Sequence, residues 1–452
     1  MTSTWTIALR NLARNRRRTL TSGLALAVGV AGISLLGGYV ARVELFLRTS
    51  AIYLQNTGHI VVYKAGGLEH ASSRPRKFNL SASELAAVRS TLSALPEVEL
   101  AVDYLSGVGL LGNGCKSVPF LGVGVDPKLH ARVLQHPEVV RVTPDLARPV
   151  QGKILAEYAS IEGAVALSSG LARRLSKSRV HDQLPPGRTA GALPDCKAAS
   201  ADQFAADANV QLVALTYDGS LSAQDGEIVS TIKTPLSAAD ETTLVTSLSR
   251  LQQLFDTDTA TYVAVFLKPS ANIHAARDSV EARLRGAGLQ VSVYAFDDER
   301  INPYYAGNMA MLRSIFTFFS VLVACVVALS VVNAMTLNVI ERTRELGTFR
   351  ALGFTRRDLL GLFVRESVLL AGAASIAGVL VARLCASLIN GAELRFQPPG
   401  VTDPYQIVIA TPPALSAMTC AALLCLCALS TWSAVRRSVR TGIHRLLSHA
   451  AA

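Results

Sequence analysis

The chain has 452 residues, half of them hydrophobic, and a formal net charge of +11. The hydrophobic residues gather in four long runs with almost no charge, which excludes an ordinary soluble globular enzyme. The arginines flank these runs instead of forming one basic surface, so we expect membrane lipid, and no nucleic acid, as their partner.

The chain begins with a basic segment, residues 1–18. Within it, Trp5, Leu9 and Leu12 recur at helical spacing while the arginines fall on another face, which predicts an amphipathic helix lying in the cytoplasmic interface. The alternative is that these residues simply begin the first membrane helix. Residues 19–41 carry no charge and are predicted to span the membrane, since the run is too long for a signal peptide.

Residues 42–306 are predicted to form one large α+β domain outside the membrane. Its ending, in which two strands flank a helix, suggests a split α/β subdomain with another subdomain inserted in it. The predicted strands are 58–63, several pieces between 98 and 125, 210–217, 227–232, 262–267 and 290–294; the predicted helices are 81–95, one within 161–175, 238–255 and 272–286. Residues 176–208 have the composition of a loop.

Seven cysteines are present, and only Cys115 and Cys196 lie outside the four apolar runs. We hypothesise a disulfide between them, which an oxidising compartment would permit. The alternative is two free buried thiols. No cysteine pair has the spacing of a zinc site, and we expect no metal, no cofactor and no catalytic residue in this chain.

Three further membrane helices are predicted at 311–340, 367–390 and 410–435. Arginines are dense in the loop 341–366 and in the tail 436–452, whereas the loop 391–409 has only Arg395. Because positive charge stays in the cytoplasm, we expect both termini and the 341–366 loop to be cytoplasmic and the large domain to be outside.

The loop after the second predicted span has the most specific sequence of the chain. Glu341 and Glu345 are one helical turn apart, and Glu345 and Arg350 bracket a predicted break at Gly347. Gly353 suits a helix C-terminus, and Thr355 with Asp358 forms a capping-box pattern for the next helix. The alternative reading of these charges is a solvated hairpin that flanks the membrane.

The third predicted span carries a stripe of small residues at every fourth position: Ala374, Gly378, Ala382 and Ala386. Small residues at this spacing let helices approach closely in lipid. We therefore expect this face to pack on another span.

These features together resemble the permease subunits of the MacB/LolE/FtsX superfamily of ABC transporters, also called mechanotransmission transporters. The resemblance is carried by the sequence from Ile7 to Thr19, by Gly58-His59-Ile60, by Glu341-Arg-Thr-Arg-Glu-Leu-Gly347 with Arg350-Ala-Leu-Gly353, and by one span before and three after a large domain. Residues 210–232 are similar to the lipoprotein-release branch, LolC/LolE.

The resemblance implies a bacterial inner-membrane protein with a two-part periplasmic domain: a porter part at about 51–150 and 258–300, and a sabre-like part at about 151–257. It also implies a second permease copy, identical or related, and separate ATPase subunits that bind ATP and Mg. The sequence departs from the family in its long 176–208 insertion. It also lacks the phosphate-binding pattern Gly-x-x-x-x-Gly-Lys-Ser/Thr.

A permease without a nucleotide site must receive energy through a contact. We expect that contact at Glu341, Arg342, Glu345, Gly347, Arg350 and Gly353. The expected function is ATP-driven release of lipoproteins, or export of a similar periplasmic cargo. The chain would then have a periplasmic or lipoprotein partner. The alternative is an FtsX-like scaffold that activates a peptidoglycan hydrolase. A membrane enzyme is disfavoured because neither His-Glu-x-x-His nor Gly-x-Ser-x-Gly occurs.

Overall fold

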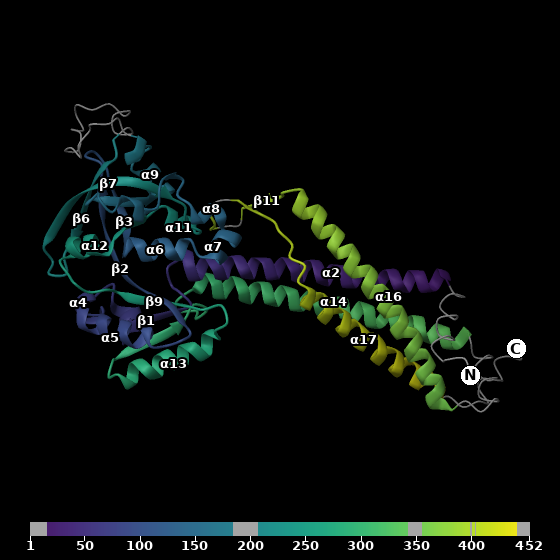
Figure 1. The fold of residues 1–452 in the computed structure, drawn as a ribbon. Coiled ribbons are helices and arrows are strands. Elements are labelled where there is room, and N and C mark those ends of the chain that lie inside the picture. Colours follow the sequence, from purple (N-terminus) through teal and green to yellow (C-terminus); the bar gives the residue numbers. More distant parts are fainter. Residues whose placement is uncertain (1–15, 184–206, 342–354, 398–399, 403, 441–452) are drawn as a thin grey trace, which may run out of the picture. The chain divides into compact units, whose positions relative to one another are not determined.

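The computed structural model describes residues 16–183, 207–341, 355–397, 400–402 and 404–440 (Figure 1). The chain divides into two compact units. The helical unit comprises residues 1–44, 309–396 and 406–452, and the sheet unit comprises residues 45–308 and 397–405. Each unit is described by itself below.

Four long helices form the described part of the helical unit: α2 (Arg16–Thr49), α14 (Pro303–Glu341), α16 (Arg356–Gly391) and α17 (Pro413–Arg440). Each is long and apolar enough to cross a membrane, as the four apolar runs predict. The helices extend beyond the predicted spans, because polar residues next to an apolar run can continue the same helix. With 34 residues, α2 is about 50 Å long at about 1.5 Å per residue, against a hydrocarbon core of about 30 Å.

Glycines of α2 show the direction in which its neighbours run. Gly29 faces Val323 and Val327 of α14, whereas Gly37 faces Phe316, so α14 runs opposite to α2. Gly23 faces Leu370 of α16, whereas Gly378 faces Ala27 and Val30, so α16 runs in the same direction as α2. Gly37 also meets Leu415 near the start of α17, which therefore begins beside the far end of the α2 span. These directions are those of a chain that crosses a membrane four times.

The sheet unit is built on one ten-stranded sheet of mixed direction (Figure 1). Its strand order is β10-β1-β9-β2-β3-β8-β5-β7-β4, and β6 pairs with both β2 and β7. The strands are β1 (Ile60–Lys64), β2 (Val98–Gly112), β3 (Ser117–Val125), β4 (Gln151–Gly152), β5 (Ala164–Ser168), β6 (Asn209–Leu215), β7 (Leu221–Ile232), β8 (Thr243–Ser247), β9 (Tyr262–Leu267) and β10 (Val291–Ala295).

Short helices join and cover these strands. They are the π-helical turn η1 (Ser50–Leu54), α3 (Gly67–His70), α4 (Pro75–Phe78), α5 (Ala82–Ser93), α6 (Pro127–Leu134), α7 (Pro137–Val142), α8 (Pro144–Ala147), η2 (Leu155–Tyr158), α9 (Ser169–Arg174), η3 (His181–Gln183), α11 (Ser237–Asp240), α12 (Leu248–Phe255) and α13 (Ile273–Gly286). A separate pair, β11 (Arg395–Phe396) and β12 (Tyr405–Gln406), lies between α16 and α17 in the sequence.

The sheet unit has two hydrophobic cores. One core packs α5 and α13 on β1, β9 and β10, with Val88, Val265 and Val280 fully buried. The other packs α9 and α12 on β3, β5, β6, β7 and β8, with Leu167 and Leu244 fully buried. One sheet runs through both cores.

The cores do not divide the chain at residue 150, the predicted limit of the porter part. Leu105 and Leu111 of β2, and Phe120 of β3, belong to the second core. The long strand β2 pairs with β9 at its beginning and with β6 at its end, so a single strand contributes to both cores. A local sequence pattern cannot show that one strand contributes to two cores.

Several local predictions are confirmed. Strand β9 has its predicted bounds, α13 and β10 lie within one residue of theirs, and Ser81 and Glu84 form the predicted capping box of α5. The predicted helix 238–255 is wrong. It is a short α11, then β8, then α12, because Leu244 and Val245 are buried within the sheet. Strand β5 was also absent from the prediction for 161–175, where only the helix was expected.

Candidate functional site at the helix ends that flank residues 342–354

The end of α14 and the start of α16 pack together at one end of the helical unit. Val339 of α14, Leu359 and Phe363 of α16 and Val435 of α17 form one buried hydrophobic cluster. We call this group the end cluster. The helix end before segment 342–354 and the helix start after it therefore pack together and against α17.

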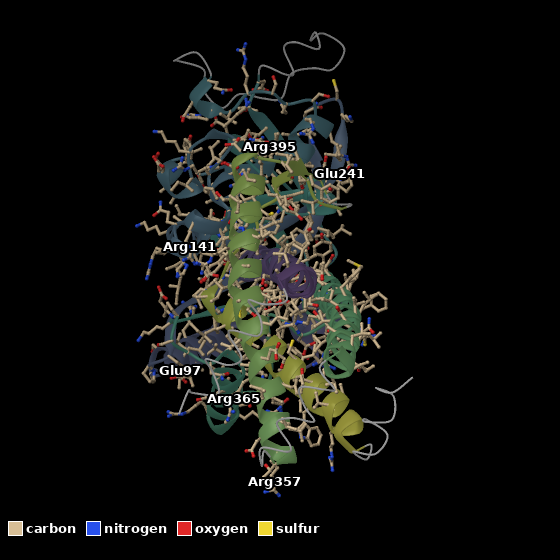
Figure 2. All side chains as sticks on the ribbon, turned by 90° about the vertical axis from the view of Figure 1, so that its right-hand side faces the viewer. Glu97, Arg141, Glu241, Arg357, Arg365 and Arg395 are labelled. Atoms are coloured by element: carbon tan, nitrogen blue, oxygen red, sulfur yellow. The ribbon has the colours of Figure 1, made fainter. Side chains whose placement is uncertain are left out.

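The start of α16 is fixed by the predicted capping box. The Thr355 hydroxyl accepts from the Asp358 amide, and the Asp358 carboxylate accepts from the Thr355 amide at 2.9 Å. Residues 356–366 are therefore helical, as the capping-box pattern predicts, so only the first part of the cytoplasmic segment 341–366 precedes a helix. Figure 2 shows Arg357 near the start of α16 and Arg395 just beyond its end.

Glu366 is a feature that sequence reasoning missed. It is only 3% exposed although it carries a carboxyl group, and it lies three residues after Phe363 of the end cluster. The sequence analysis placed it within the cytoplasmic segment 341–366 and gave it no role. The capping box at Thr355 was the available signal, because a helix that begins there extends ten residues before it reaches Glu366.

Most of the predicted coupling residues lie outside the described residues. Glu341 is the last residue of α14. Arg342, Glu345, Gly347, Arg350 and Gly353 all fall in 342–354, which the structure does not describe. The amphipathic helix predicted at 4–14 likewise lies outside the described residues.

The predicted small-residue stripe of α16 is buried in the helical unit. Ala374, Ala382 and Ala386 are each at most 5% exposed. A Cβ atom added to Gly378 would lie 2.6 Å from the carbonyl oxygen of Ala27 and 2.8 Å from Cβ of Val30, both on α2. The backbones of the two helices therefore approach so closely at this point that only glycine fits without a shift.

At the other end of the helical unit, polar contacts join the helices. Arg313 of α14 forms an ion pair with Glu44 of α2 at 3.2 Å. The side chain of Asn390, near the end of α16, donates to the Ile409 carbonyl and accepts from the Ile409 amide. The helices are thus joined by an apolar cluster at the end that flanks 342–354 and by polar contacts at the other end.

In the sheet unit, the Gly58-His59-Ile60 motif links three strands. The His59 amide donates to the Val265 carbonyl of β9, and its carbonyl accepts from the Phe296 amide after β10. Its Nδ1 accepts from the Leu267 amide at 3.2 Å. Gly58 has a φ of +67°, and a Cβ there would lie 2.8 Å from the Val265 carbonyl oxygen. Tyr53 packs edge-on against the His59 ring, with centroids 5.7 Å apart.

Cys115 is disulfide-bonded. Cys196 lies outside the described residues, so the predicted pairing stays a prediction. The base of the 176–208 insertion is held by a buried ion pair between Lys177 and Asp207, and burial lowers the pKa of Lys177. Across the described ranges, no three His, Cys, Asp or Glu side chains are placed to hold a metal ion.

Comparison with known proteins finds similarity in the helical region. Residues 317–443 match the family described as FtsX-like permease C-terminal, a range from within α14 to past α17. The chain is 25% identical over 158 residues to the macrolide export ATP-binding/permease protein MacB of Nitrobacter winogradskyi, covering 35% of this chain and 24% of that protein. It is 28% identical to MacB of Bdellovibrio bacteriovorus, and the match covers 31% of this chain and 22% of that protein. The chain therefore spans about a quarter of the length of these relatives.

Two solved structures are also similar. The periplasmic region of MacB from Actinobacillus actinomycetemcomitans covers 53% of this chain and 90% of its own, at 13% identity and a TM-score of 0.33. The extracellular domain of the ABC-type transporter YknZ from Gram-positive bacteria covers 52% and 98%, at 11% identity and a TM-score of 0.30. Both TM-scores are low, so neither likeness bears on function. In its last three described long helices the chain is therefore similar to FtsX-like permeases, and over about a third of its length it is similar to MacB proteins.

Proposed function

We propose that this chain is the permease subunit of a transporter driven by a separate ATPase, and that segment 342–354 receives the ATPase. The observation that carries the proposal is the end cluster, which seats both ends of that segment on α14, α16 and α17. The matched permease family covers the same helices. The sequence holds no Gly-x-x-x-x-Gly-Lys-Ser/Thr pattern, so ATP would bind to the partner.

The proposed orientation places both termini and residues 342–354 in the cytoplasm of an inner-membrane protein, with the sheet unit in the periplasm. It is supported by the arginines beside α2, α14, α16 and α17 and by the alternating directions of the helices. The four-span layout is then one helix before the sheet unit and three after it, with a second permease copy completing the complex.

Continuous helices supply a route for movement. Helix α2 runs without a break from Arg16 to Thr49, and its last residues belong to the sheet unit. Helix α14 begins in the sheet unit at Pro303 and ends at Glu341, beside segment 342–354 in the sequence. A displacement of these helices would therefore reach the sheet unit through the backbone itself.

The proposed cargo is a lipoprotein or a similar periplasmic molecule, supported by the similarity of residues 210–232 to the lipoprotein-release branch. The test is reconstitution of the chain with its co-encoded ATPase in lipid nanodiscs. We expect a stable complex in which ATP promotes release of a bound triacylated lipoprotein, and a non-acylated form of that protein serves as the control. Failure of the ATPase to bind would contradict the proposed function. Release of neither form, with stimulation of a peptidoglycan hydrolase instead, would favour the FtsX-like scaffold.

A further inference from the structure

The segment 397–405, between α16 and α17 in the sequence, belongs to the sheet unit. The chain thus passes between the two units at four places. Two of these lie inside the continuous helices α2 and α14, and the other two lie on either side of 397–405. The sequence suggested only a short loop at 391–409.

The segment is joined to the β7–α11 connection by backbone hydrogen bonds. The Thr402 amide donates to the Pro235 carbonyl at 3.3 Å, and the Ser237 amide donates to the Gly400 carbonyl at 3.0 Å. Val401 and Leu236 therefore form an antiparallel bridge. The Val401 side chain is 8% exposed, so the bridge also buries an apolar group.

Both ends of the segment have further contacts within the sheet unit. The Gln397 amide nitrogen Nε2 donates to the carbonyls of Val401 and Thr402, at 3.1 and 3.0 Å. The Tyr405 ring stacks on Phe46, with centroids 5.5 Å apart. The Gln397 contacts thus close the segment on itself, while residues 400–402 and Tyr405 contact residues outside it.

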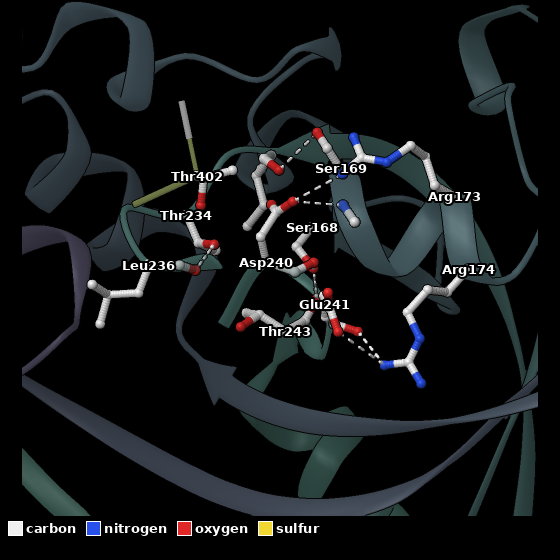
Figure 3. A network of polar contacts seen from close by, with 12 residues as sticks. Ser168, Ser169, Arg173, Arg174, Thr234, Leu236, Asp240, Glu241, Thr243 and Thr402 are labelled. Atoms are coloured by element: carbon white, nitrogen blue, oxygen red, sulfur yellow. Dashed lines mark hydrogen bonds and ion pairs between the residues drawn. The ribbon is translucent and has the colours of Figure 1, made fainter. Parts of the chain in front are cut away.

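The residues that receive the segment are themselves fixed to the sheet (Figure 3). The Leu236 carbonyl accepts from the Thr234 hydroxyl and from the Asp240 amide. Asp240 is 2% exposed; its carboxylate accepts from the Gly170 amide at 2.8 Å, and its carbonyl accepts from the Ser168 hydroxyl at 2.6 Å. Ser168 ends strand β5, whose Val165 and Leu167 belong to the second core, so hydrogen bonds connect Leu236 to a strand of that core.

We propose that residues 400–402, bridged to residues 235–237, are a fixed tie through which displacement of α16 and α17 is transmitted to residues 234–240 of the sheet unit. The proposal rests on the proposed function, because the displacement is that driven by the ATPase. It adds a second route to the one through α2 and α14. A fixed tie stays bridged throughout the cycle, whereas an ordinary surface loop would detach.

The first experiment tests whether the bridge exists and persists. Directly opposed residues of an antiparallel bridge are close enough for a disulfide. Leu236→Cys/Val401→Cys in the full chain should therefore crosslink with a mild oxidant, both without nucleotide and with the ATPase trapped by vanadate, as read by mass spectrometry. The control pair is Ser220→Cys/Val401→Cys. The fixed tie would be overturned if the Leu236→Cys/Val401→Cys pair crosslinked no better than the control pair, or if its crosslink were lost in the vanadate-trapped state.

The second experiment tests transmission by hydrogen exchange of residues 234–240 in the complex, with and without vanadate-trapped ATPase. We expect a nucleotide-dependent change in the wild type that falls by about 2- to 30-fold in Val401→Asp. Thr402→Val is the matched control, because it keeps the side-chain shape and the backbone bonds. An unchanged response in Val401→Asp, or none in the wild type, would contradict the proposal. ATPase binding is measured separately, so failure of the proposed function would be seen as loss of binding while the crosslink still reports on the bridge.

Discussion

Gly378 shows how a single residue sets the distance between two membrane helices. Its missing side chain lets α16 approach the Ala27 carbonyl of α2. Apolar helices in lipid gain little from the hydrophobic effect, so close packing is a main source of their association. The small-residue spacing predicted this face, but it could not show which helix would lie against it.

Gly378→Ala should destabilise the helical unit, because the new Cβ would clash with a backbone atom that cannot move alone. We expect a loss of roughly 1–3 kcal/mol in the free energy of unfolding, measured by thermal denaturation in nanodiscs. Gly372→Ala is the control, since nothing lies within 4 Å of the added Cβ there. Equal stability of the two variants would show that α2 and α16 do not pack at Gly378.

His59 is a buried histidine that must stay neutral in the folded protein. Burial lowers its pKa to about 3, and the charges of Arg48 and His136 act in the same direction. Its Nδ1 accepts the Leu267 amide hydrogen, which a protonated ring could not do. The unfolded histidine titrates near pH ~6.5, so the unfolded state binds more protons between these two values.

The stability due to neutral His59 should therefore be complete above pH ~6.5 and lost as the pH falls toward 3, by at most about 1.4 kcal/mol per pH unit. His130, whose pKa burial lowers to about 4, adds to the same trend. Hydrogen exchange of strand β9 in the full chain, corrected for intrinsic rates, should rise from pH 7 to pH 4.5. His59→Gln should reduce this pH dependence, and the exposed control His70→Gln should not. An equal change of exchange with pH in the two variants would show that His59 does not cause the loss of stability.

Among the elements, those with strong local signals were predictable. Ser81 with Glu84 and Thr355 with Asp358 mark helix starts because their side chains satisfy free amides of the first turn. Strand β8 was not predictable, because it is five residues long and lies between two short helices. Its pairing with β3 and β5 decides its conformation, and both partners are far away in the sequence.

The insertion 176–208 should be attached to the sheet unit by a disulfide between Cys115 and Cys196. Such a bond closes a long loop and would contribute roughly 2–4 kcal/mol. Alkylation of denatured, non-reduced protein should leave both cysteines unlabelled, and prior reduction should label both. Two labelled external cysteines without reduction would rule the bond out.

At the scale of the whole molecule, two separate observations support the proposed topology: the helix directions support alternating crossings, and the arginines support the proposed cytoplasmic side. The arginines flank alternate ends of the apolar helices, and α2 and α16 run opposite to α14. The long-range features were beyond sequence reasoning: one sheet running through two cores, and segment 397–405 bridged to Leu236. Both depend on pairings between residues that are distant in the sequence.

Reporter fusions should confirm this topology in cells. A reporter after Gly187 should be active only in the periplasm, and reporters after Gly353 or Ala452 should be active only in the cytoplasm. The reason is that arginine-rich segments are retained on the cytoplasmic side. A cytoplasmic signal at Gly187 would overturn the proposed orientation of every helix.

The central claim is that segment 342–354 couples a separate ATPase to this permease. Glu345 and Arg350 offer charges of both signs to a partner, so reversing them should weaken binding without affecting membrane insertion. The direct measurement is binding of the purified co-encoded ATPase to the full chain in nanodiscs, together with ATP-driven cargo release. We predict that Glu345→Lys alone uncouples release, and that Glu345→Lys/Arg350→Glu loses both binding and release. Unchanged binding and release in the double variant would contradict the claim and place the contact elsewhere.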